Sequence, residues 1–241
     1  MSIRTIARAI LNLLPLRLRC LLPSLLRRGR IELGVGSYIH PSVHILGRSN
    51  VRIGRNSCIS EGTWLNVNHR QDGHTAIAIG DHCFIGKQNF FSSGAAIEIG
   101  DYTLTTFGCK FVGSSHVIDD PGVPYLLTGT TATDRICIGV NCFIGAGATV
   151  LGNVSVGHGS VIGTDALVLQ DIPPFSIAVG NPARVVQRYS FPRQAWVAAA
   201  ELKAEEVAAM PDEAAYRARL VARAPVVAMP WSAAGKGMGD L

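Results

Sequence analysis

The chain has 241 residues, of which 48% are hydrophobic and only 16% charged, and its formal net charge is +5. This length suits one large globular domain with appendages better than two full domains. The positive charge is local, because residues 1–30 hold seven arginines and no acidic residue. The repeats that follow have no basic or aromatic patch, so nucleic acid is not expected among the partners.

Residues 1–30 are predicted to form a basic amphipathic helical extension. Apolar residues recur on one side of a helix as far as Pro15, and arginines lie elsewhere. The run is too short and too charged to span a bilayer, and no small-x-small cleavage site follows it, as a signal peptide would require. Two interpretations stay open: a helix packed on the end of the main domain, or a segment lying on a membrane surface.

A six-residue repeat governs the centre of the chain and is clearest over residues 138–171. Position two is usually Gly, and position five is small or aliphatic. Position one is always aliphatic, at Ile138, Ile144, Val150, Val156, Ile162 and Val168. A period of six fits neither an α-helix nor a simple strand, and it is typical of a β-helix with short strands and Gly-rich corners. Residues 31–188 are therefore predicted to form an all-β domain, a parallel β-helix.

The repeat reaches back to Leu33 with a longer period and two interruptions. Aliphatic–Gly pairs at Leu33, Ile53, Ile79 and Ile99 are separated by steps of 20, 26 and 20 residues. The six extra residues fall in the polar segment 66–75, which predicts a protruding loop. A second excursion, about residues 119–135, contains the prolines and glycines of a surface loop. Long loops on a rigid repeat usually carry function.

The repeat ends at residues 171–174, Asp-Ile-Pro-Pro. Residues 177–186 predict a last strand, and residues 192–210 and 212–223 predict helices rich in Ala and Glu. Residues 189–241 are therefore assigned to C-terminal helices and a flexible tail.

The six cysteines form no CxxC pair. Cys83, Cys109 and Cys142 occupy position five of a hexad, where small buried residues belong. They are expected to be free thiols packed in the core of a protein from a reducing cytoplasm.

Repeated aliphatic-Gly-x-x-small-x units, followed by Asp-Ile-Pro-Pro and by Gly-Asn-Pro-Ala-Arg at 180–184, resemble the hexapeptide-repeat acyltransferases. Within them the chain is most similar to bacterial sugar O-acetyltransferases. The resemblance implies a left-handed coil, a homotrimer, acetyl-CoA as the donor and active sites in clefts between subunits. It predicts acetyl transfer to a sugar hydroxyl of a bacterial surface polysaccharide or its precursor. This reaction would take place in the cytoplasm, where the inner face of the membrane is one location.

His116 is the candidate catalytic residue. Transfer of an acetyl group from a thioester to a hydroxyl needs a general base, for which histidine is suited, and donors for the oxyanion. His116 takes a corner position immediately before the long excursion, where similar sugar acetyltransferases carry their catalytic histidine. The alternative is an ordinary solvent-facing histidine. The family often has a second His or Asp within two residues; this chain has neither there, so the residue that orients the imidazole is not identified.

The resemblance also indicates binding residues. Asn89 is similar to an acceptor-contacting asparagine of the family, and the alternative is a buried amide satisfied by the coil backbone. For acetyl-CoA, the resemblance points to Ala146, Thr164 and Arg184, the last for the phosphates. Many relatives have a lysine where Gln170 stands.

Two other activities remain open at this point. One is N-acetylation of a nucleotide-linked amino sugar. The other is a zinc-dependent β-helix carbonic anhydrase, because His69 and His74 imitate part of its ligand spacing. A third histidine ligand has no clear candidate, so no metal is expected.

Overall fold

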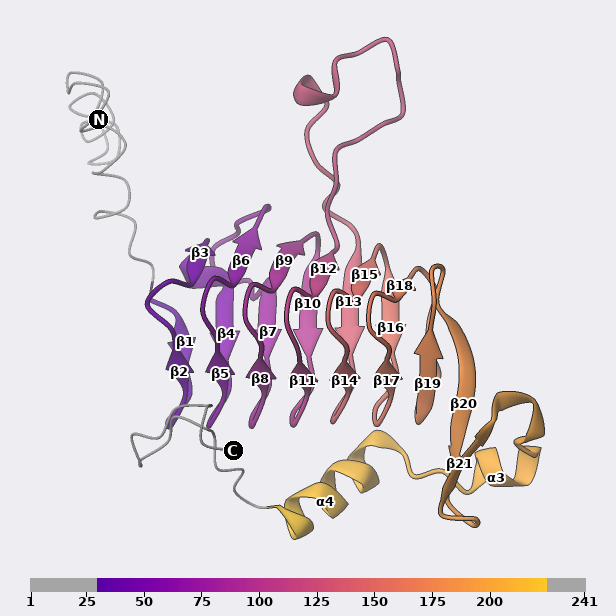
Figure 1. The fold of residues 1–241 in the computed structure, drawn as a ribbon. Helices are drawn as coiled ribbons and strands as arrows, with labels where there is room; N and C mark the ends of the chain where they lie inside the picture. The colour runs from indigo at the N-terminus through magenta and orange to yellow at the C-terminus, as the bar shows by residue number, and fades with distance from the viewer. Residues whose placement is uncertain (1–29, 225–241) are drawn as a thin grey trace, which may run out of the picture. The chain divides into compact units, whose positions relative to one another are not determined.

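The computed structural model describes residues 30–224, so the expectations for the N-terminal extension and for the tail after residue 224 lie outside the described residues. Within this range the chain winds through three β-sheets in turn. In the coil, strands three apart in the chain pair in parallel, as the repeating pattern of Figure 1 shows. The predicted all-β class and its parallel strands are confirmed.

We name the sheets A, B and C in the order in which the chain enters them. Sheet A has six strands in the described range: β1 (Glu32–Leu33), β4 (Val51–Ile53), β7 (Ile77–Ile79), β10 (Ala96–Ile99), β13 (Arg135–Ile138) and β16 (Val154–Val156). Sheet C also has six there: β3 (His44–Leu46), β6 (Trp64–Val67), β9 (Phe90–Ser93), β12 (Lys110–Val112), β15 (Thr149–Leu151) and β18 (Leu167–Val168). The edges along which they meet are called the A–B, B–C and C–A corners.

Sheet B is longer than the other two because the chain folds back onto it. Its parallel part is β2 (Tyr38–Ile39), β5 (Cys58–Ile59), β8 (Phe84–Ile85), β11 (Leu104–Thr105), β14 (Phe143–Ile144), β17 (Val161–Ile162) and β19 (Ser176–Val179). The antiparallel strands β20 (Arg184–Ser190) and β21 (Ala195–Ala198) follow. The single last strand predicted over 177–186 is therefore wrong. A turn at 180–183 reverses the chain. The Leu167 backbone N–H donates to the Gly180 carbonyl at 3.0 Å, and the Ala183 N–H donates to the Leu167 carbonyl at 2.7 Å.

The aliphatic residues at position one form the core. Ile53, Ile79, Ile99, Ile138 and Val156 lie in register on neighbouring strands of sheet A, each at most 3% exposed. Side chains of parallel strands in register stack directly on one another, so each coil covers the apolar surface of the previous one. This stacking is why an uncharged, Ile-rich repeat folds as a coil.

Glycine at position two is required by the neighbouring coil. A Cβ atom at Gly139 would lie 2.5 Å from the backbone nitrogen of His158 in the next coil, which is too close for any side chain. The regular Gly therefore marks the corners where backbones stack most tightly.

The predicted position-five cysteines are buried. Cys83 and Cys109 have no exposed surface and Cys142 is 2% exposed. The cysteines between residues 30 and 224 are all free. Burial raises the pKa of the Cys83 and Cys142 thiols to about 12, so both stay protonated and unreactive at neutral pH.

Two excursions leave the coil, as predicted, and both leave at the C–A corner. The first loop covers residues 68–76, between β6 and β7, and Asn50 holds it by donating to the carbonyls of Gln71 and His74. The second, which we call the arm, covers residues 113–134 and projects from the coil in Figure 1. Near its tip is a 3₁₀ turn, Tyr125–Leu127, whose central residue Leu126 is 86% exposed.

The C-terminal region is only partly helical. Helix α4 (Glu213–Arg223) matches the prediction, and Asp212 caps it by accepting from the Ala215 backbone at 2.8 Å. The helix predicted over 192–210 is wrong, because residues 195–198 pair with β20 as strand β21. A 3₁₀ turn (Ala199–Glu201) and the short helix α3 (Ala204–Ala208) follow. Neither α3 nor α4, nor any other described helix, is long and apolar enough to cross a membrane.

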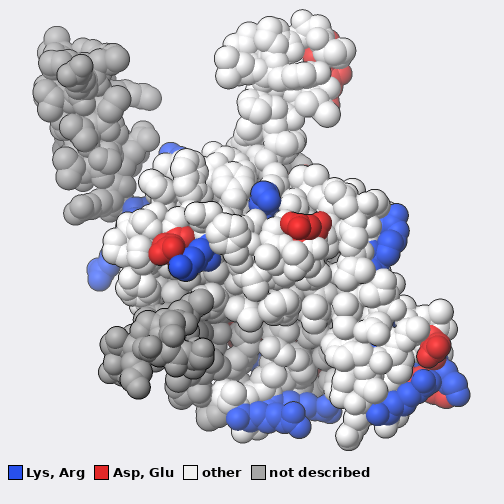
Figure 2. Space-filling model, viewed as in Figure 1, with Lys and Arg blue, Asp and Glu red and all other residues white. Residues whose placement is uncertain are grey.

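Charged side chains are sparse on the coil. In Figure 2 the basic side chains form separate groups, and several lie next to acidic ones. On the outer face of sheet A, Arg135 pairs with Glu98 at 2.5 Å. The face shown in Figure 2 thus presents no single continuous basic surface.

Candidate active site at the base of the arm

The two ends of the arm pair with each other before they enter the coil. Two backbone hydrogen bonds, of 2.8 and 3.2 Å, join residues 115–117 to residues 129–131 as a short antiparallel ribbon. We call these six residues the neck. The bonds flank the pair His116–Thr130, which is therefore a non-hydrogen-bonded pair. Side chains of such a pair leave the ribbon on the same face and lie close together.

His116 lies in the neck rather than on the coil corner itself. The sequence placed it at the last position of a hexad, but the coil ends at Val112 and the arm has already begun at residue 113. The His116 side chain is exposed and makes no hydrogen bond to any residue between 30 and 224. Its imidazole is therefore available to exchange a proton with a bound molecule.

The first loop reaches the neck, a contact that the sequence did not indicate. His69 places Nε2 at 2.9 Å from the carbonyl oxygen of Thr131 and at 3.2 Å from Oγ1 of Thr130. Ser114 donates its hydroxyl to the same Thr131 carbonyl at 2.7 Å. The available signal was that both excursions follow a third hexad of their coil, which puts both loops on one corner.

Polar side chains continue along this corner toward the first loop. Asn68 donates to the Ser92 hydroxyl at 2.9 Å and to the Ser93 carbonyl at 3.1 Å, and Asn66 donates to Asn68 at 2.7 Å. Amides and hydroxyls of this kind can bind sugar hydroxyls. The region beside the neck is thus polar, in contrast to the apolar interior of the coil.

Asn89 lies inside the coil, away from this corner. It has no exposed surface, and its amide nitrogen donates to three backbone carbonyls, the shortest bond being 2.7 Å to Thr106. A side chain used in this way cannot reach an acceptor from within one subunit. The amide nitrogen of Asn89 thus supports the B–C corner, whereas its buried Oδ1 has no hydrogen-bond partner in the described range, and the acceptor contact assigned to Asn89 stays a prediction.

Ala146, Thr164 and Arg184 lie along the B–C corner. Ala146 and Thr164 follow Ile144 and Ile162, which pair in register, so the two lie one above the other. In the described part of the chain their backbone N–H groups donate no hydrogen bond, while Ala146 O accepts from Asp165 at 2.8 Å. Thr164 and Arg184 are exposed. The corner therefore offers two open backbone donors and a guanidinium.

The two candidate sites lie at opposite edges of sheet C. His116 follows a sheet C strand at the C–A corner, whereas Ala146 and Thr164 precede sheet C strands at the B–C corner. One copy of the chain does not bring them together across that sheet. A site that uses both sets needs a neighbouring copy.

His69 and His74 do not converge. His74 places Nε2 at 3.0 Å from the carbonyl oxygen of Ala95, whereas the His69 imidazole faces the neck. Among residues 30–224, no group of three or more His, Cys, Asp or Glu side chains is placed to hold a metal ion. Each imidazole instead contacts a backbone carbonyl, that of Thr131 for His69 and that of Ala95 for His74.

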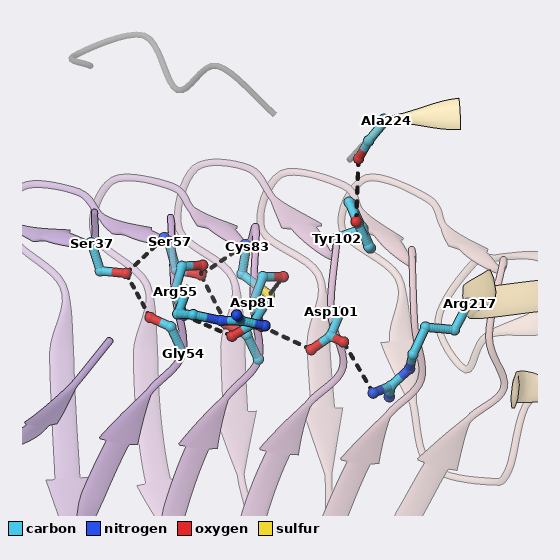
Figure 3. A network of polar contacts seen from close by, with 11 residues as sticks. Ser37, Gly54, Arg55, Ser57, Asp81, Cys83, Asp101, Tyr102, Arg217 and Ala224 are labelled. Carbon is cyan, nitrogen blue, oxygen red and sulfur yellow. Dashed lines mark hydrogen bonds and ion pairs between the residues drawn. The ribbon is translucent and has the colours of Figure 1, made fainter. Parts of the chain in front are cut away.

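A separate groove of about 590 Å³ lies between sheet A and helix α4, and it contains none of the predicted site residues. The polar network at its side is shown in Figure 3. Arg55 pairs with Asp81 at 2.7 Å, and Arg217 of α4 pairs with Asp101 at 3.1 Å. Tyr102 adds a hydrogen bond to the Ala224 carbonyl at 3.2 Å. The contacts of Arg217 and Ala224 fasten α4 to the coil.

The sequence has relatives among bacterial acetyltransferases, although no family model matches it. The chain is 31% identical over 200 residues to the probable acetyltransferase Rv3034c of Mycobacterium tuberculosis, covering 82% of this chain and 62% of that protein. It is 34% identical over 112 residues to the putative acetyltransferase SACOL2570 of Staphylococcus aureus, covering 46% and 55%. The chain thus spans less than two thirds of the length of these relatives.

The fold is shared with a solved acyltransferase. A point mutant of AntD, an N-acyltransferase from Bacillus cereus, was solved with dTDP-4-amino-4,6-dideoxyglucose and coenzyme A. It superposes with a TM-score of 0.58 at 18% identity, over 78% of this chain and 97% of that chain. At this identity the likeness shows the fold alone.

Proposed function

We propose that the chain is a hexapeptide-repeat acyltransferase that transfers an acetyl group from acetyl-CoA to a sugar hydroxyl, with His116 as the general base. One observation carries the proposal. The His116 imidazole is exposed and uncommitted among the described side chains, and it is held in a paired neck above a rigid coil. A general base needs this combination of a free nitrogen and a fixed position.

Besides a general base, acetyl transfer from a thioester requires few catalytic groups of the protein. Acetyl-CoA supplies a thioester whose thiolate leaves readily. His116 accepts the hydroxyl proton as the acceptor oxygen bonds to the acetyl carbon, and it returns that proton to the departing sulfur. Transfer is proposed to be direct, because the buried Cys83 and Cys142 thiols, whose pKa is raised, stay protonated and cannot form an acyl intermediate.

The B–C corner is the proposed site for acetyl-CoA, which has amides in its pantetheine arm and phosphates at its nucleotide end. The free backbone N–H groups of Ala146 and Thr164 can donate to the amide carbonyls. The exposed guanidinium of Arg184 can pair with a phosphate. Gln170 in place of the lysine of many relatives leaves Arg184 as the main candidate for this charge.

A left-handed coil and a homotrimer form part of the proposal, as the resemblance implies. In a trimer, the B–C corner of one subunit can face the neck of the next, which supplies the shared cleft that one copy lacks. Leu104 and Phe143 on sheet B, and Leu151 and Leu169 along sheet C, are between 37 and 46% exposed. Such apolar side chains are suited to packing against neighbouring copies.

The acceptor is proposed to be a sugar of a bacterial surface polysaccharide or its precursor. The half-buried amides of Asn66 and Asn68 in the first loop region suit a carbohydrate. An amino-sugar nitrogen is the competing acceptor, and AntD, which has the same fold, is an N-acyltransferase. Assaying methyl hexosides beside amino sugars and their nucleotide-linked forms decides between the two, because only the second class gives an amide product.

The arginine-rich residues 1–30 are proposed to contact the inner face of the membrane from the cytoplasm. Seven arginines without an acidic residue are attracted to anionic lipids. Deleting residues 1–30 should abolish co-sedimentation with phosphatidylserine vesicles and leave turnover of a soluble sugar intact. If the deletion instead makes the protein insoluble, the segment is structural.

The experiment that tests the catalytic proposal replaces His116 by alanine. General-base catalysis is typically worth about 10²–10⁴-fold, so kcat for the best acceptor of the panel should fall by that order. The KM for acetyl-CoA and the trimer should be unchanged, because both depend on the coil. His44→Ala, at an exposed histidine on the first described strand of sheet C, is the control and should keep full turnover. Normal turnover in His116→Ala, with the trimer intact, would refute the assignment.

A further inference from the structure

We propose that His69 is a positioning residue for His116, acting through Thr130 and Thr131 of the neck. The inference rests on the proposed function, since it names the group that fixes the catalytic imidazole. It rests on the hydrogen bonds between His69 of the first loop and the arm. It also rests on the lack of other hydrogen bonds between residues 114–133 and the rest of the described chain.

The chemistry of the contact defines its direction. The carbonyl oxygen of Thr131 can only accept, so the His69 Nε2 atom 2.9 Å away must carry the hydrogen. Ser114 donates its hydroxyl to the same oxygen at 2.7 Å, so that oxygen accepts from both sides of the neck. The Thr130 hydroxyl lies 3.2 Å from the same His69 nitrogen. One imidazole thus contacts two consecutive residues of one neck strand.

Thr130 links this contact to the catalytic face. It is the cross-strand partner of His116 in a non-hydrogen-bonded pair, so both side chains leave the neck on the same face. A displacement of Thr130 therefore moves the backbone that carries His116. Because the His116 side chain has no hydrogen bond of its own in the described range, its position depends on this backbone.

Within the part of the chain that the structure describes, no further hydrogen bond holds the neck. Among residues 30–224, the hydrogen bonds of residues 114–133 join residues of the arm to each other, apart from the two to His69. The strand ends at 113 and 134 enter the coil through backbone bonds, for example Gly113 to the Ser92 carbonyl at 2.9 Å. Without His69 the neck could swing about these two points. A displacement near 1 Å can cost about a hundred-fold in rate.

The first loop supplies a matched control. His74 is also half-buried, and its Nε2 also faces a backbone carbonyl, that of Ala95 at 3.0 Å. Its partner Ala95 belongs to the β9–β10 turn and donates its backbone N–H to Asp134, at the end of the arm, at 2.8 Å. His74 itself makes no hydrogen bond to the neck in the described range, so replacing His74 perturbs the same loop without removing a contact to the neck.

The test compares His69→Leu, His69→Gln and His74→Leu in the full chain, with acetyl-CoA and the panel of methyl hexosides and amino sugars. His69→Leu should lower kcat by roughly 10- to 100-fold, less than His116→Ala does, with the KM for acetyl-CoA unchanged. His69→Gln should recover most of this loss, because its amide can donate to Thr131. His74→Leu should behave as wild type. Deuterium exchange at the Val117 and Thr131 amides should be faster in His69→Leu alone.

Several outcomes overturn the inference. A wild-type kcat in His69→Leu would overturn the positioning role of His69. An equal loss of kcat in His74→Leu would overturn it as well. A His69→Gln variant as slow as His69→Leu would show that the imidazole itself reacts. The double variant His69→Leu/His116→Ala gives a further check. If its kcat is no lower than that of His116→Ala, positioning is supported; if the two losses in kcat multiply, positioning is contradicted. If His69→Leu does not fold, Thr130→Val replaces it: a kcat loss with faster neck exchange supports the inference, and unchanged kcat contradicts it.

The failure of the proposed function gives a different result. If His116→Ala is fully active, the base assignment is wrong whatever His69 does. The exchange rates of the neck amides still report whether His69 holds the neck, because that measurement needs no substrate. If His116→Ala is active and the neck amides exchange faster in His69→Leu, His116 is not the catalytic base. The structural contact between His69 and the neck would still be supported.

Discussion

The coil and the arm follow different rules, although they are continuous in the chain. In the coil, each inward side chain stacks on the equivalent side chain of the next turn, and residues such as Ile97, Phe111 and Ile144 have no exposed surface. In the arm, residues 118–127 are exposed throughout and bond mainly to each other. Folding energy is therefore concentrated in the coil, whereas the candidate base lies in the segment that contributes least to it.

This separation has a consequence for function. A coil held by repetition can tolerate an insertion at a corner, because each turn contacts only its neighbours. An insertion at the C–A corner can then differ in sequence without altering the proposed donor site on the B–C corner. Variants that affect stability and variants that affect turnover should accordingly fall in different regions.

The largest effect is expected from the core. The ring of Phe111 is fully buried and stacks on Phe91 with centroids 4.6 Å apart. Phe111→Ala should lower the free energy of unfolding by about 3–5 kcal/mol. Tyr125→Ala in the exposed arm should change it by less than about 0.5 kcal/mol. Urea titration measures both, and similar losses in the two variants would contradict the contrast between coil and arm.

The next effect is expected where the arm meets the coil. A Cβ atom at Gly94 would collide with the carbonyl oxygen of Gly113, the first residue of the arm. Gly94→Ala should cost about 1–3 kcal/mol and should also reduce kcat, since the neck must shift. Gly122→Ala, beyond the neck, meets only the flexible Asp120 side chain and should change neither quantity. A Gly94→Ala variant with lower stability but full turnover would contradict the claim that the position of the neck affects kcat.

A smaller effect is expected at the proposed donor site. Arg184→Ala should raise the KM for acetyl-CoA about ten-fold, equivalent to about 1.4 kcal/mol, and leave kcat and stability nearly unchanged. Arg135→Ala removes an exposed arginine paired on sheet A and serves as the control. Steady-state kinetics at two salt concentrations measure the effect, which should shrink at high salt. Equal KM values in the two variants would place the CoA phosphates elsewhere.

The smallest effect concerns the C-terminal cap formed by β20, β21 and α3. The Glu206 carboxylate is almost buried there, and hydrogen bonds from the Ser190 hydroxyl and the Lys203 backbone, then Arg193, lower its pKa. A lowered pKa stabilises the cap above the ordinary pKa of glutamic acid, and this contribution is lost as pH falls through the folded-state value.

Deuterium exchange of residues 184–208 measures this effect. Exchange should accelerate below about pH 4 while the coil amides remain protected. Glu206→Gln should remove the acid dependence. Loss of protection in cap and coil at the same pH would show that they unfold as one unit.

The coil could be predicted from the sequence because its cause is local and repeated. An aliphatic residue at position one and Gly at position two set each corner, so Ile53, Ile79 and Ile99 indicated the successive turns from their spacing alone. Relatives named as acetyltransferases agree with the acetyltransferase part of the resemblance to hexapeptide-repeat acyltransferases. The two excursions were also found, since any departure from a regular period is visible.

Features that depend on non-repeating segments were not predicted. The contact of His69 with the neck joins two loops that have no period, so the sequence placed both loops on one corner but could not indicate which of their residues touch. The turn at 180–183 was missed because apolar residues on both sides continued the strand pattern. Asn89 was ambiguous since an amide at position five can either bind a ligand or satisfy a backbone corner. The roles of His116, Ala146, Thr164 and Arg184 stay predictions until they are measured.

The antiparallel pairing of β20 with β19 also bears on solubility. A parallel coil presents open strand edges at its end, and such edges invite the next copy to add strands and grow into a fibre. In sheet B the chain occupies this edge itself, first with β20 and then with β21. Because β20 and β21 run antiparallel to their neighbours, they break the repeat that another coil would have to match. The hairpin at residues 184–198 thus removes the open edge of sheet B, at which strands of another copy could otherwise add.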